Sequence, residues 1–274
     1  MGRGMCSMLP ELGRGSAAAA PRAVRPPAWG TVGAMPTLLL CDFPAKTELP
    51  RWSSFSPFVL QIDRALALAK LPYEKHYVDM LKLKRLNPLG QLPVLVVDGE
   101  NVADSTRILH RIEALAPGTM LRGLDARGQA EAWLWEEFAD TALYPHVLTA
   151  RWADDRGWPV PRGAFFGAVP APLRSLVANA VRRGTIKKLV QRDFLRGGLE
   201  AAYERIDRVL DTLDARAPEQ GFWVGEHPSV ADLGLFAQLH SLRLPTVAHG
   251  AERIAARPRL ERYLDRVDAA TLPG

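Results

Sequence analysis

Two patterns of hydrophobic positions divide the chain. Before residue 117, short apolar runs such as 35–44 and 94–97 are bounded by turn residues, which is typical of strands. Beyond residue 125, apolar residues recur every three or four positions, which is typical of amphipathic helices. The pattern therefore predicts an α/β domain over 36–117 and an all-helical domain over 125–270, joined near residues 117–124.

A β-hairpin is predicted near the end of the first domain. The aliphatic run 94–97 leads into Asp98-Gly99, a dipeptide that tolerates positive φ, and Val102 resumes the apolar pattern. Pro93 stands at the start of the first strand and lacks a backbone N–H, so neighbouring backbone groups stay free of the ladder. An extended peptide could pair there.

A helix is predicted directly after the hairpin, beginning at Asp104-Ser105. Asp and Ser are preferred helix caps, and the apolar residues that follow have helical spacing: Ile108, Leu109, Ile112 and Leu115. The exposed N–H groups of a helix start attract a carboxylate. The alternative is that Asp104 and Ser105 only cap the helix.

A second helix start lies closer to the N-terminus. The run 35–44 predicts a buried strand, and Ser56-Pro57 combines an N-cap with proline at the first helical position. Strand, loop and helix in this order are a thioredoxin-like opening. A thiolate would be stabilised beside the hydroxyl and the free N–H groups of the first turn. Simple capping is again the alternative.

Two other serines compete with Ser56 for this role. Ser53 and Ser54 lie two or three residues earlier, but counting back from the helix core at Ile62 favours Ser56. The chain has two cysteines, Cys6 and Cys41, and neither occupies the positions of a redox CxxC pair at this helix start. Disulfide exchange is therefore not expected.

The second domain reads as a series of helices. The predicted ranges are 126–154, 173–194, 199–217, 230–242 and 259–267. Ser229 and Asp232 have the spacing of an N-terminal capping box, so we assign Asp232 a folding role and not a catalytic one.

Composition narrows the class of protein. The 274 residues carry a formal charge of +5, and residues 1–34 hold four arginines and one glutamate, so +3 of that charge lies there and +2 in the rest. Nucleic-acid binding gains little support. No run approaches a membrane span, and the histidines lack metal-ligand spacing. Residues 1–35 are expected to be a disordered tail, with Met35 as a candidate native start.

The motifs at 56–62, 87–105, 151–174 and 224–232 together resemble the glutathione S-transferase family over residues 36–270. The resemblance implies a thioredoxin-like domain followed by a helical domain. It also implies that Ser56 donates a hydrogen bond to the glutathione thiolate. Gln91, Leu92 and a cis Pro93 would bind the peptide backbone, and Asp104 with Ser105 would hold the γ-glutamyl end.

The resemblance further implies an enzyme that transfers glutathione, without a metal, to a hydrophobic electrophile. Tyr144 and Trp152 could line the electrophile pocket together with Trp158, Phe165 and Phe166, although ordinary core packing is an alternative for each. Lys82 and Lys84 are candidates for the glycyl carboxylate of glutathione, or else part of a solvated loop.

Other functions stay open at this point. The segment 151–174 is also similar to metaxin and failed-axon-connections proteins, so a non-catalytic interaction protein is the alternative. A third interpretation is glutathione-dependent ether cleavage or dehalogenation. The insertion at 45–55 departs from the family pattern and could cap the thiol pocket or displace it. Family members are commonly homodimers, and a cytoplasmic location is expected.

Overall fold

The computed structural model describes residues 35–44, 54–80, 82–167, 169–244 and 247–273. The predicted tail, Cys6, Ser53 and most of the 45–55 insertion lie outside these residues. Everything below concerns the unit Pro36–Gly274.

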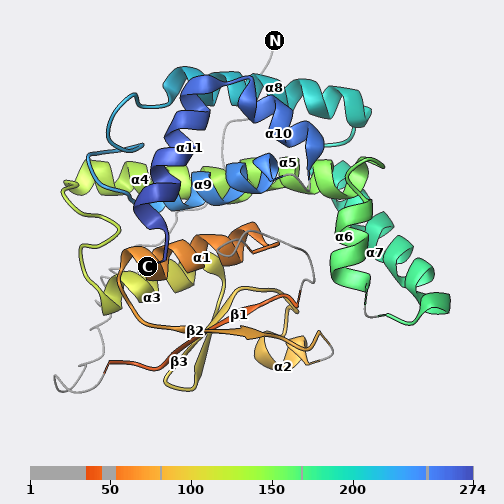
Figure 1. Ribbon diagram of the computed structural model, residues 1–274, viewed down its shortest axis with the longest axis horizontal. Coiled ribbons are helices and arrows are strands. Elements are labelled where there is room, and N and C mark those ends of the chain that lie inside the picture. The colour runs from red at the N-terminus through yellow and green to blue at the C-terminus, as the bar shows by residue number, and fades with distance from the viewer. Residues whose placement is uncertain (1–34, 45–53, 81, 168, 245–246, 274) are drawn as a thin grey trace, which may run out of the picture. The chain divides into compact units, whose positions relative to one another are not determined.

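A four-stranded sheet forms the first half of this unit (Figure 1). The strands are β1 Leu38–Asp42, β2 Glu74–Tyr77, β3 Val94–Val97 and β4 Glu100–Ala103, in the spatial order β2-β1-β3-β4. β2 runs parallel to β1, and the other neighbours are antiparallel. The parallel pair needs a crossover connection, which α1 Pro57–Leu68 supplies. This is the arrangement expected of a thioredoxin-like domain.

The predicted hairpin is confirmed. β3 pairs with β4 from Val94–Ala103 to Val97–Glu100, and the turn residues Asp98 and Gly99 have φ of 50° and 87°. Helix α3 Ser105–Leu115 begins where the sequence predicts. Strand β2 and the short helix α2 Leu83–Leu86 were not predicted, because β2 is a largely exposed edge strand with polar residues and no apolar run.

The second half is all helical. The predicted range 126–154 forms α4 Ala126–Phe138, the π-helical turn η1 Ala139–Leu143, α5 Tyr144–Leu148 and a second π-helical turn, η2 Thr149–Ala153. The remaining helices are α6 Pro159–Phe166, α7 Ala171–Gln191, α8 Gly198–Arg216, α9 Val230–Arg243, α10 Ala248–Ala255 and α11 Pro258–Thr271. Helices α6 and α10 are additions to the predicted set.

Helix α9 is the centre of this half. Every residue from Val230 to Leu242 is buried, and α9 packs against α1 and α4. The predicted capping box is confirmed: the Asp232 carboxylate accepts hydrogen bonds from the Ser229 N–H and hydroxyl, both at 2.8 Å. The same carboxylate accepts from the Tyr263 hydroxyl at 2.7 Å. Its contacts are therefore those of a folding residue, as predicted.

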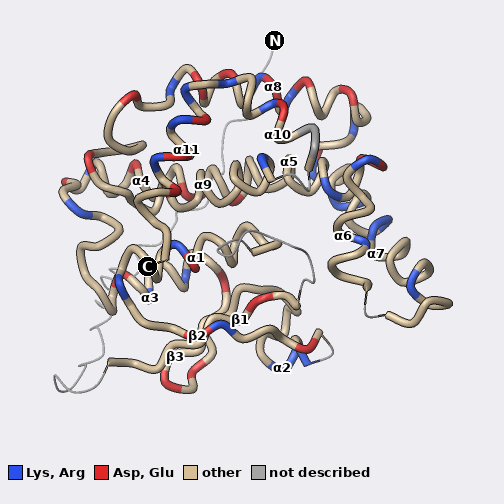
Figure 2. The backbone as a smooth tube through the Cα atoms, viewed as in Figure 1, with Lys and Arg blue, Asp and Glu red and all other residues tan. Residues whose placement is uncertain are grey.

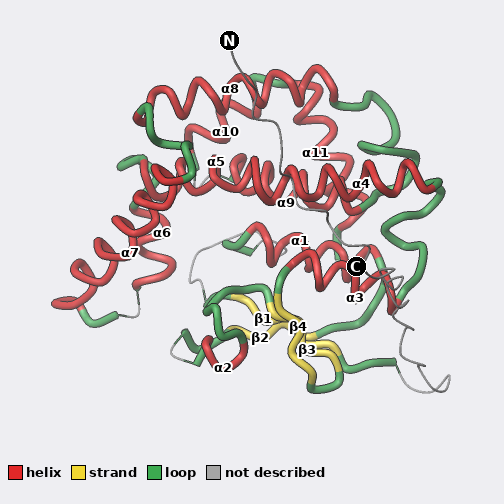
Figure 3. The backbone as a smooth tube through the Cα atoms, turned by 180° about the vertical axis from the view of Figure 1, so that it is seen from behind, coloured by secondary structure: helices red, strands yellow, loops and turns green. Residues whose placement is uncertain are grey.

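The two halves share one packed interior. Helices α1 and α3 lie between the sheet and the helices α4 and α9 (Figures 1 and 3). Charged residues of both signs alternate along the outer helices α8 and α11 (Figure 2). Arg257, the residue before α11, pairs with Asp211 of α8 at 2.7 Å. Within the described residues no single helix is long and apolar enough to cross a membrane. Helices α6 and α7, which are bent by 120° relative to each other, reach the required length and apolar composition only when they are counted together.

Candidate functional site

Strand register brings three predicted segments to one end of the sheet. Cys41, near the end of β1, pairs with Val94 at the start of β3, and Val94 pairs with Ala103 at the end of β4. The next residues outward are Asp42, Pro93 and Asp104, so the loop to Ser56, the Leu92–Pro93 peptide and the start of α3 all leave the sheet at this end.

Ser56 is the N-cap of α1, as predicted. The Val59 N–H donates to the Ser56 hydroxyl at 3.4 Å, and Pro57 occupies the first helical position. Ser54 makes different contacts, since its hydroxyl donates to the Asp42 carboxylate at 2.7 Å and accepts from the Ser56 N–H at 3.1 Å. Of the two described serines, only Ser56 therefore has its hydroxyl at the helix N-terminus.

The peptide bond between Leu92 and Pro93 is cis, as the family resemblance implies. Leu92 and Pro93 are buried, whereas the Gln91 side chain is exposed. The Asn87 amide donates to the Gln91 carbonyl at 2.9 Å and so holds the segment before β3 in place. The Leu92 backbone thus lies at the end of the sheet from which the loop to Ser56 also leaves.

Asp104 caps α3 in an unusual backbone conformation. Its carboxylate accepts from the Arg107 N–H at 3.1 Å, and its φ is 82°. A positive φ in a residue with a side chain costs about 1–3 kcal/mol and is concentrated at functional sites. The Asp104 carboxylate thus lies over the first turn of α3.

The Ser105 hydroxyl is not free, because it donates to the Asp140 carboxylate of η1 at 3.3 Å. One residue on, the Thr106 hydroxyl donates to Glu136 of α4 at 3.1 Å, and Gln61 of α1 donates to the same oxygen at 3.2 Å. Two acidic side chains of the helical half therefore lie against the start of α3.

These two acids were not among the predicted site residues. Burial, and the repulsion between neighbouring carboxylates, raise the pKa of both Glu136 and Asp140 above the ordinary range. A signal was present in the sequence, since the two residues lie four apart on the same face of one helical run, and that spacing places them one turn from each other. Nothing in the local sequence related that face to Ser105.

The aromatic residues proposed for the electrophile pocket are packed together. Tyr144 contacts Phe58 of α1 edge to face, with centroids 4.6 Å apart. Trp152 stacks on Phe165 at 5.8 Å, and Phe165 contacts Phe55, the residue before Ser56, at 4.8 Å. An aromatic wall thus runs from the helical half to the α1 start.

Other candidate residues have simpler surroundings. Lys82 and Lys84 are exposed at the start of α2, and Lys82 pairs with Asp79 at 3.7 Å. Cys41 is a buried free thiol in β1, and burial raises its pKa. Among the described residues no group of three or more His, Cys, Asp or Glu side chains could hold a metal ion.

Comparison with known families gives matches in both halves of the chain. The family described as glutathione S-transferase, N-terminal domain, matches residues 55–115. The family described as glutathione S-transferase, C-terminal domain, matches residues 196–266. The first match spans Ser56, Leu92, Pro93, Asp104 and Ser105, and the second spans the capping box of α9.

Individual proteins agree with the family matches. The chain is 28% identical to protein LigF of Sphingobium sp. strain SYK-6 over 219 residues, which cover 73% of this chain and 80% of LigF. The crystal structure of beta-etherase LigF superposes with a TM-score of 0.63 at 24% identity, over 85% of this chain and 95% of that chain.

A glutathione transferase family member from Pseudomonas fluorescens, solved with two glutathione bound, has the same fold. It superposes with a TM-score of 0.58 at 17% identity and covers 85% of this chain and 88% of that chain. With both domain families matched in their expected order and with this fold, the chain belongs to the glutathione S-transferase family.

Proposed function

We propose that this protein binds glutathione as a thiolate at the α1 start and transfers it to a hydrophobic electrophile. The observation that carries the proposal is the convergence of Ser56, the Leu92–Pro93 peptide and Asp104 at one end of the sheet. Each segment supplies a different kind of contact, and an extended tripeptide needs all three. The non-catalytic alternative gains no support from the relatives.

We propose one orientation for the tripeptide. The Leu92 backbone pairs with the cysteinyl residue, which directs the thiol to the Ser56 hydroxyl. The N–H groups at the start of α3 receive the γ-glutamyl carboxylate. The Asp104 carboxylate attracts the γ-glutamyl ammonium group. Lys82 and Lys84 remain candidates for the glycyl carboxylate.

The proposed reaction is a displacement at the electrophile. The thiolate sulfur forms a bond to the electrophilic carbon, and the bond from that carbon to the leaving group breaks with its electron pair. Catalysis then consists of keeping the thiol ionised and holding the two reactants together. We place the electrophile against the aromatic wall that includes Tyr144 and Trp152.

Ether cleavage is the second candidate reaction. It is favoured by the 28% identity to LigF, whose crystal structure is described as that of a beta-etherase. In this reaction the thiolate attacks the carbon that carries the ether oxygen. The carbon–oxygen bond breaks, the oxygen leaves with the electron pair and takes a proton, and a glutathione thioether remains on the carbon.

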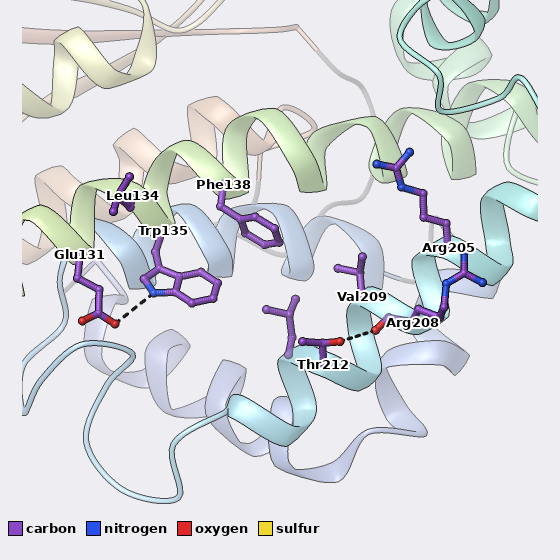
Figure 4. A pocket seen from close by; sticks show the side chains of 9 residues that line it. Glu131, Leu134, Trp135, Phe138, Arg205, Arg208, Val209 and Thr212 are labelled. Carbon is purple, nitrogen blue, oxygen red and sulfur yellow. Dashed lines mark hydrogen bonds between the residues drawn. The ribbon is translucent and has the colours of Figure 1, made fainter.

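We further propose a cytoplasmic homodimer. Support for the dimer comes from a groove of about 590 Å³ between α4 and α8 (Figure 4). Its floor is made mainly of Trp135, Phe138, Val209 and Leu213, and Leu134 at its edge is 71% exposed. Exposed apolar surface of this kind marks interaction sites.

Leu134→Glu tests the proposed dimer. It should increase the monomer fraction, as measured by light scattering after size exclusion. If the molar mass of the variant equals that of the wild-type protein, the groove no longer supports a dimer.

Calorimetric titration with glutathione, alongside the ultraviolet absorbance of the bound thiolate, tests the proposed function. We expect the wild-type protein to bind glutathione and to show the thiolate band near neutral pH. Absence of binding at millimolar glutathione would overturn the proposal. An aryl ether and an aryl halide, offered in parallel, distinguish the two reactions by the product that carries glutathione.

A further inference from the structure

A buried arginine of the helical half lies directly behind the Ser56 loop. Arg151 belongs to η2 and is 3% exposed. One terminal nitrogen donates to the Phe55 carbonyl at 2.7 Å, and the other donates to the Ser241 carbonyl of α9 at 3.2 Å. The guanidinium carbon lies 4.5 Å from the centroid of the Phe55 ring. Arg151 thus joins the core helix to the residue before Ser56.

The peptide group between Phe55 and Ser56 is held on both sides. Arg151 binds its carbonyl oxygen, and the Ser54 hydroxyl accepts from its N–H at 3.1 Å. Ser54 is anchored in turn on Asp42 at the end of β1. Because Ser56 is the N-cap of α1, fixing this peptide plane fixes where the Ser56 hydroxyl lies. One clamp comes from the sheet and the other from the helical half.

The charge of Arg151 is weakly compensated. Among the described residues its hydrogen-bond partners are two backbone carbonyls, and its Nε is buried without a partner. Burial lowers the pKa of Arg151 to about 10, so the side chain remains a cation at neutral pH. The titratable neighbour that acts on it, Tyr144 of α5, is neutral there because burial raises the pKa of its hydroxyl. The C-terminal end of α9 offers only a partial negative charge. A buried cation without a carboxylate partner favours an anion nearby.

We propose that Arg151 is a positioning residue for the transferase reaction: it fixes the Ser56 loop from the helical half, and its buried charge favours the ionised form of the bound glutathione thiol. The proposal rests on the proposed function and names a role for a residue outside the glutathione-binding domain. It also assigns a use to the π-helical turn η2, since such turns often mark functional sites and redirect side chains.

The test compares Arg151→Gln with Arg151→Lys in the full chain. Gln is neutral but can still donate to the Phe55 carbonyl, whereas Lys keeps the charge. We expect Arg151→Gln to raise the pKa of the bound thiol by about one unit and to lower kcat about tenfold below that pKa. The loss should shrink as pH rises, and KM for glutathione should change little. Arg151→Lys keeps a cation but loses the planar fork that binds both carbonyls, so its thiol pKa should stay closer to that of the wild-type protein than the thiol pKa of Arg151→Gln does.

Arg182→Met is the matched control. Arg182 is also a partly buried arginine that donates to backbone carbonyls, those of Trp152 and Ala153, and stacks on an aromatic ring, that of Trp158. It has no contact with the Ser56 loop among the described residues. We expect a lower Tm and an unchanged thiol pKa. If Arg151→Gln behaves in this way too, Arg151 is merely structural and the proposal fails.

If the Arg151 variants do not fold, Ser54→Ala tests the positioning of Ser56 while Arg151 is kept. It removes the acceptor of the Ser56 N–H and keeps the buried charge. We expect a several-fold lower kcat with the thiol pKa unchanged, and a wild-type kcat would overturn the positioning role. If the wild-type protein itself shows no thiolate band, the proposed function fails with this proposal. If the wild-type protein shows the thiolate band but the Arg151 variants do not shift the thiol pKa, the role of Arg151 is excluded and the proposed function stands.

Discussion

The starts of α1 and α3 are built alike but meet a cation in one case and a buried acid in the other. Each helix begins at the same end of the sheet, and each is capped by a side chain: Ser56 accepts from the Val59 N–H, and Asp104 from the Arg107 N–H. The helical half supplies the difference. It places the cation Arg151 behind the α1 start and the acid Asp140 against the α3 start.

This contrast shows how two similar helix starts can recognise two ends of one ligand. Both starts favour an anion through their free N–H groups. At α1 the buried arginine adds to that preference, which suits a thiolate. At α3 the Asp104 carboxylate opposes it and favours an ammonium group nearby, while the raised pKa of Asp140 keeps that side chain largely protonated at neutral pH. A γ-glutamyl end carries both a carboxylate and an ammonium group, so the mixed environment fits it.

The largest expected effect comes from removing the hydroxyl at the α1 start. Ser56→Ala removes the donor to the thiolate, and loss of one preorganised donor lowers kcat by about 10²-fold. We expect glutathione affinity to change much less, because the Leu92 and Asp104 contacts remain. Steady-state rates with an activated aryl halide measure the loss. Ser56→Thr keeps both the hydroxyl and the cap, and it should recover part of the rate; a wild-type rate in the alanine variant would exclude Ser56 as the donor.

At the α3 start, two substitutions separate charge from capping. Asn keeps a capping oxygen and tolerates positive φ, so Asp104→Asn should retain stability while weakening glutathione binding about tenfold through the lost charge. Asp104→Ala removes the cap as well and should also destabilise the fold by about 1 kcal/mol. Calorimetry and urea unfolding measure the two effects. If the asparagine variant binds like the wild-type protein, the acidic character of this start has no role in recognition.

The sequence was sufficient for features that depend on neighbouring residues. Asp98-Gly99 predicted the turn because few residues tolerate positive φ, and Ser56-Pro57 predicted a helix start through the capping preference. Asp104 was found in the same way. These local signals led to the two helix starts and, through the family resemblance, to the fold of both halves.

The contacts that distinguish the two helix starts had no such signal. The spacing of Glu136 and Asp140 puts the two acids on one face, but Arg151 and Asp140 lie in π-helical turns, where an extra residue shifts the direction in which that face points. Their partners, Phe55 and Ser105, are 96 and 35 positions away in the chain. Strand β2 was missed for a related reason, since Glu74–Tyr77 pairs at an exposed edge and needs no apolar run.

The smallest expected effect concerns the pH dependence of the acids behind α3. The pKa of Glu136 is raised in the folded protein, chiefly by burial, so the folded state holds its proton more tightly than the unfolded chain. Stability due to this group is therefore complete below the ordinary carboxyl range and is lost as pH rises through the raised pKa. Glu136→Gln removes that loss and should raise stability at pH 8 by on the order of 1 kcal/mol, with little change at pH 4.

Glu100→Gln is the control for this prediction, because Glu100 is an exposed glutamate of β4 and is not among the charges that raise the pKa of Glu136. Thermal unfolding at both pH values measures the difference, and we expect Tm of Glu136→Gln to exceed that of the wild-type protein by about 2–4 °C at pH 8 only. Equal shifts at both values would mean that the substitution acts through packing. A lower Tm at pH 8 would mean that the ionised carboxylate, bound by Thr106 and Gln61, stabilises the α3 start. The contrast between the two starts would then depend on a charged Glu136 and not on a protonated one.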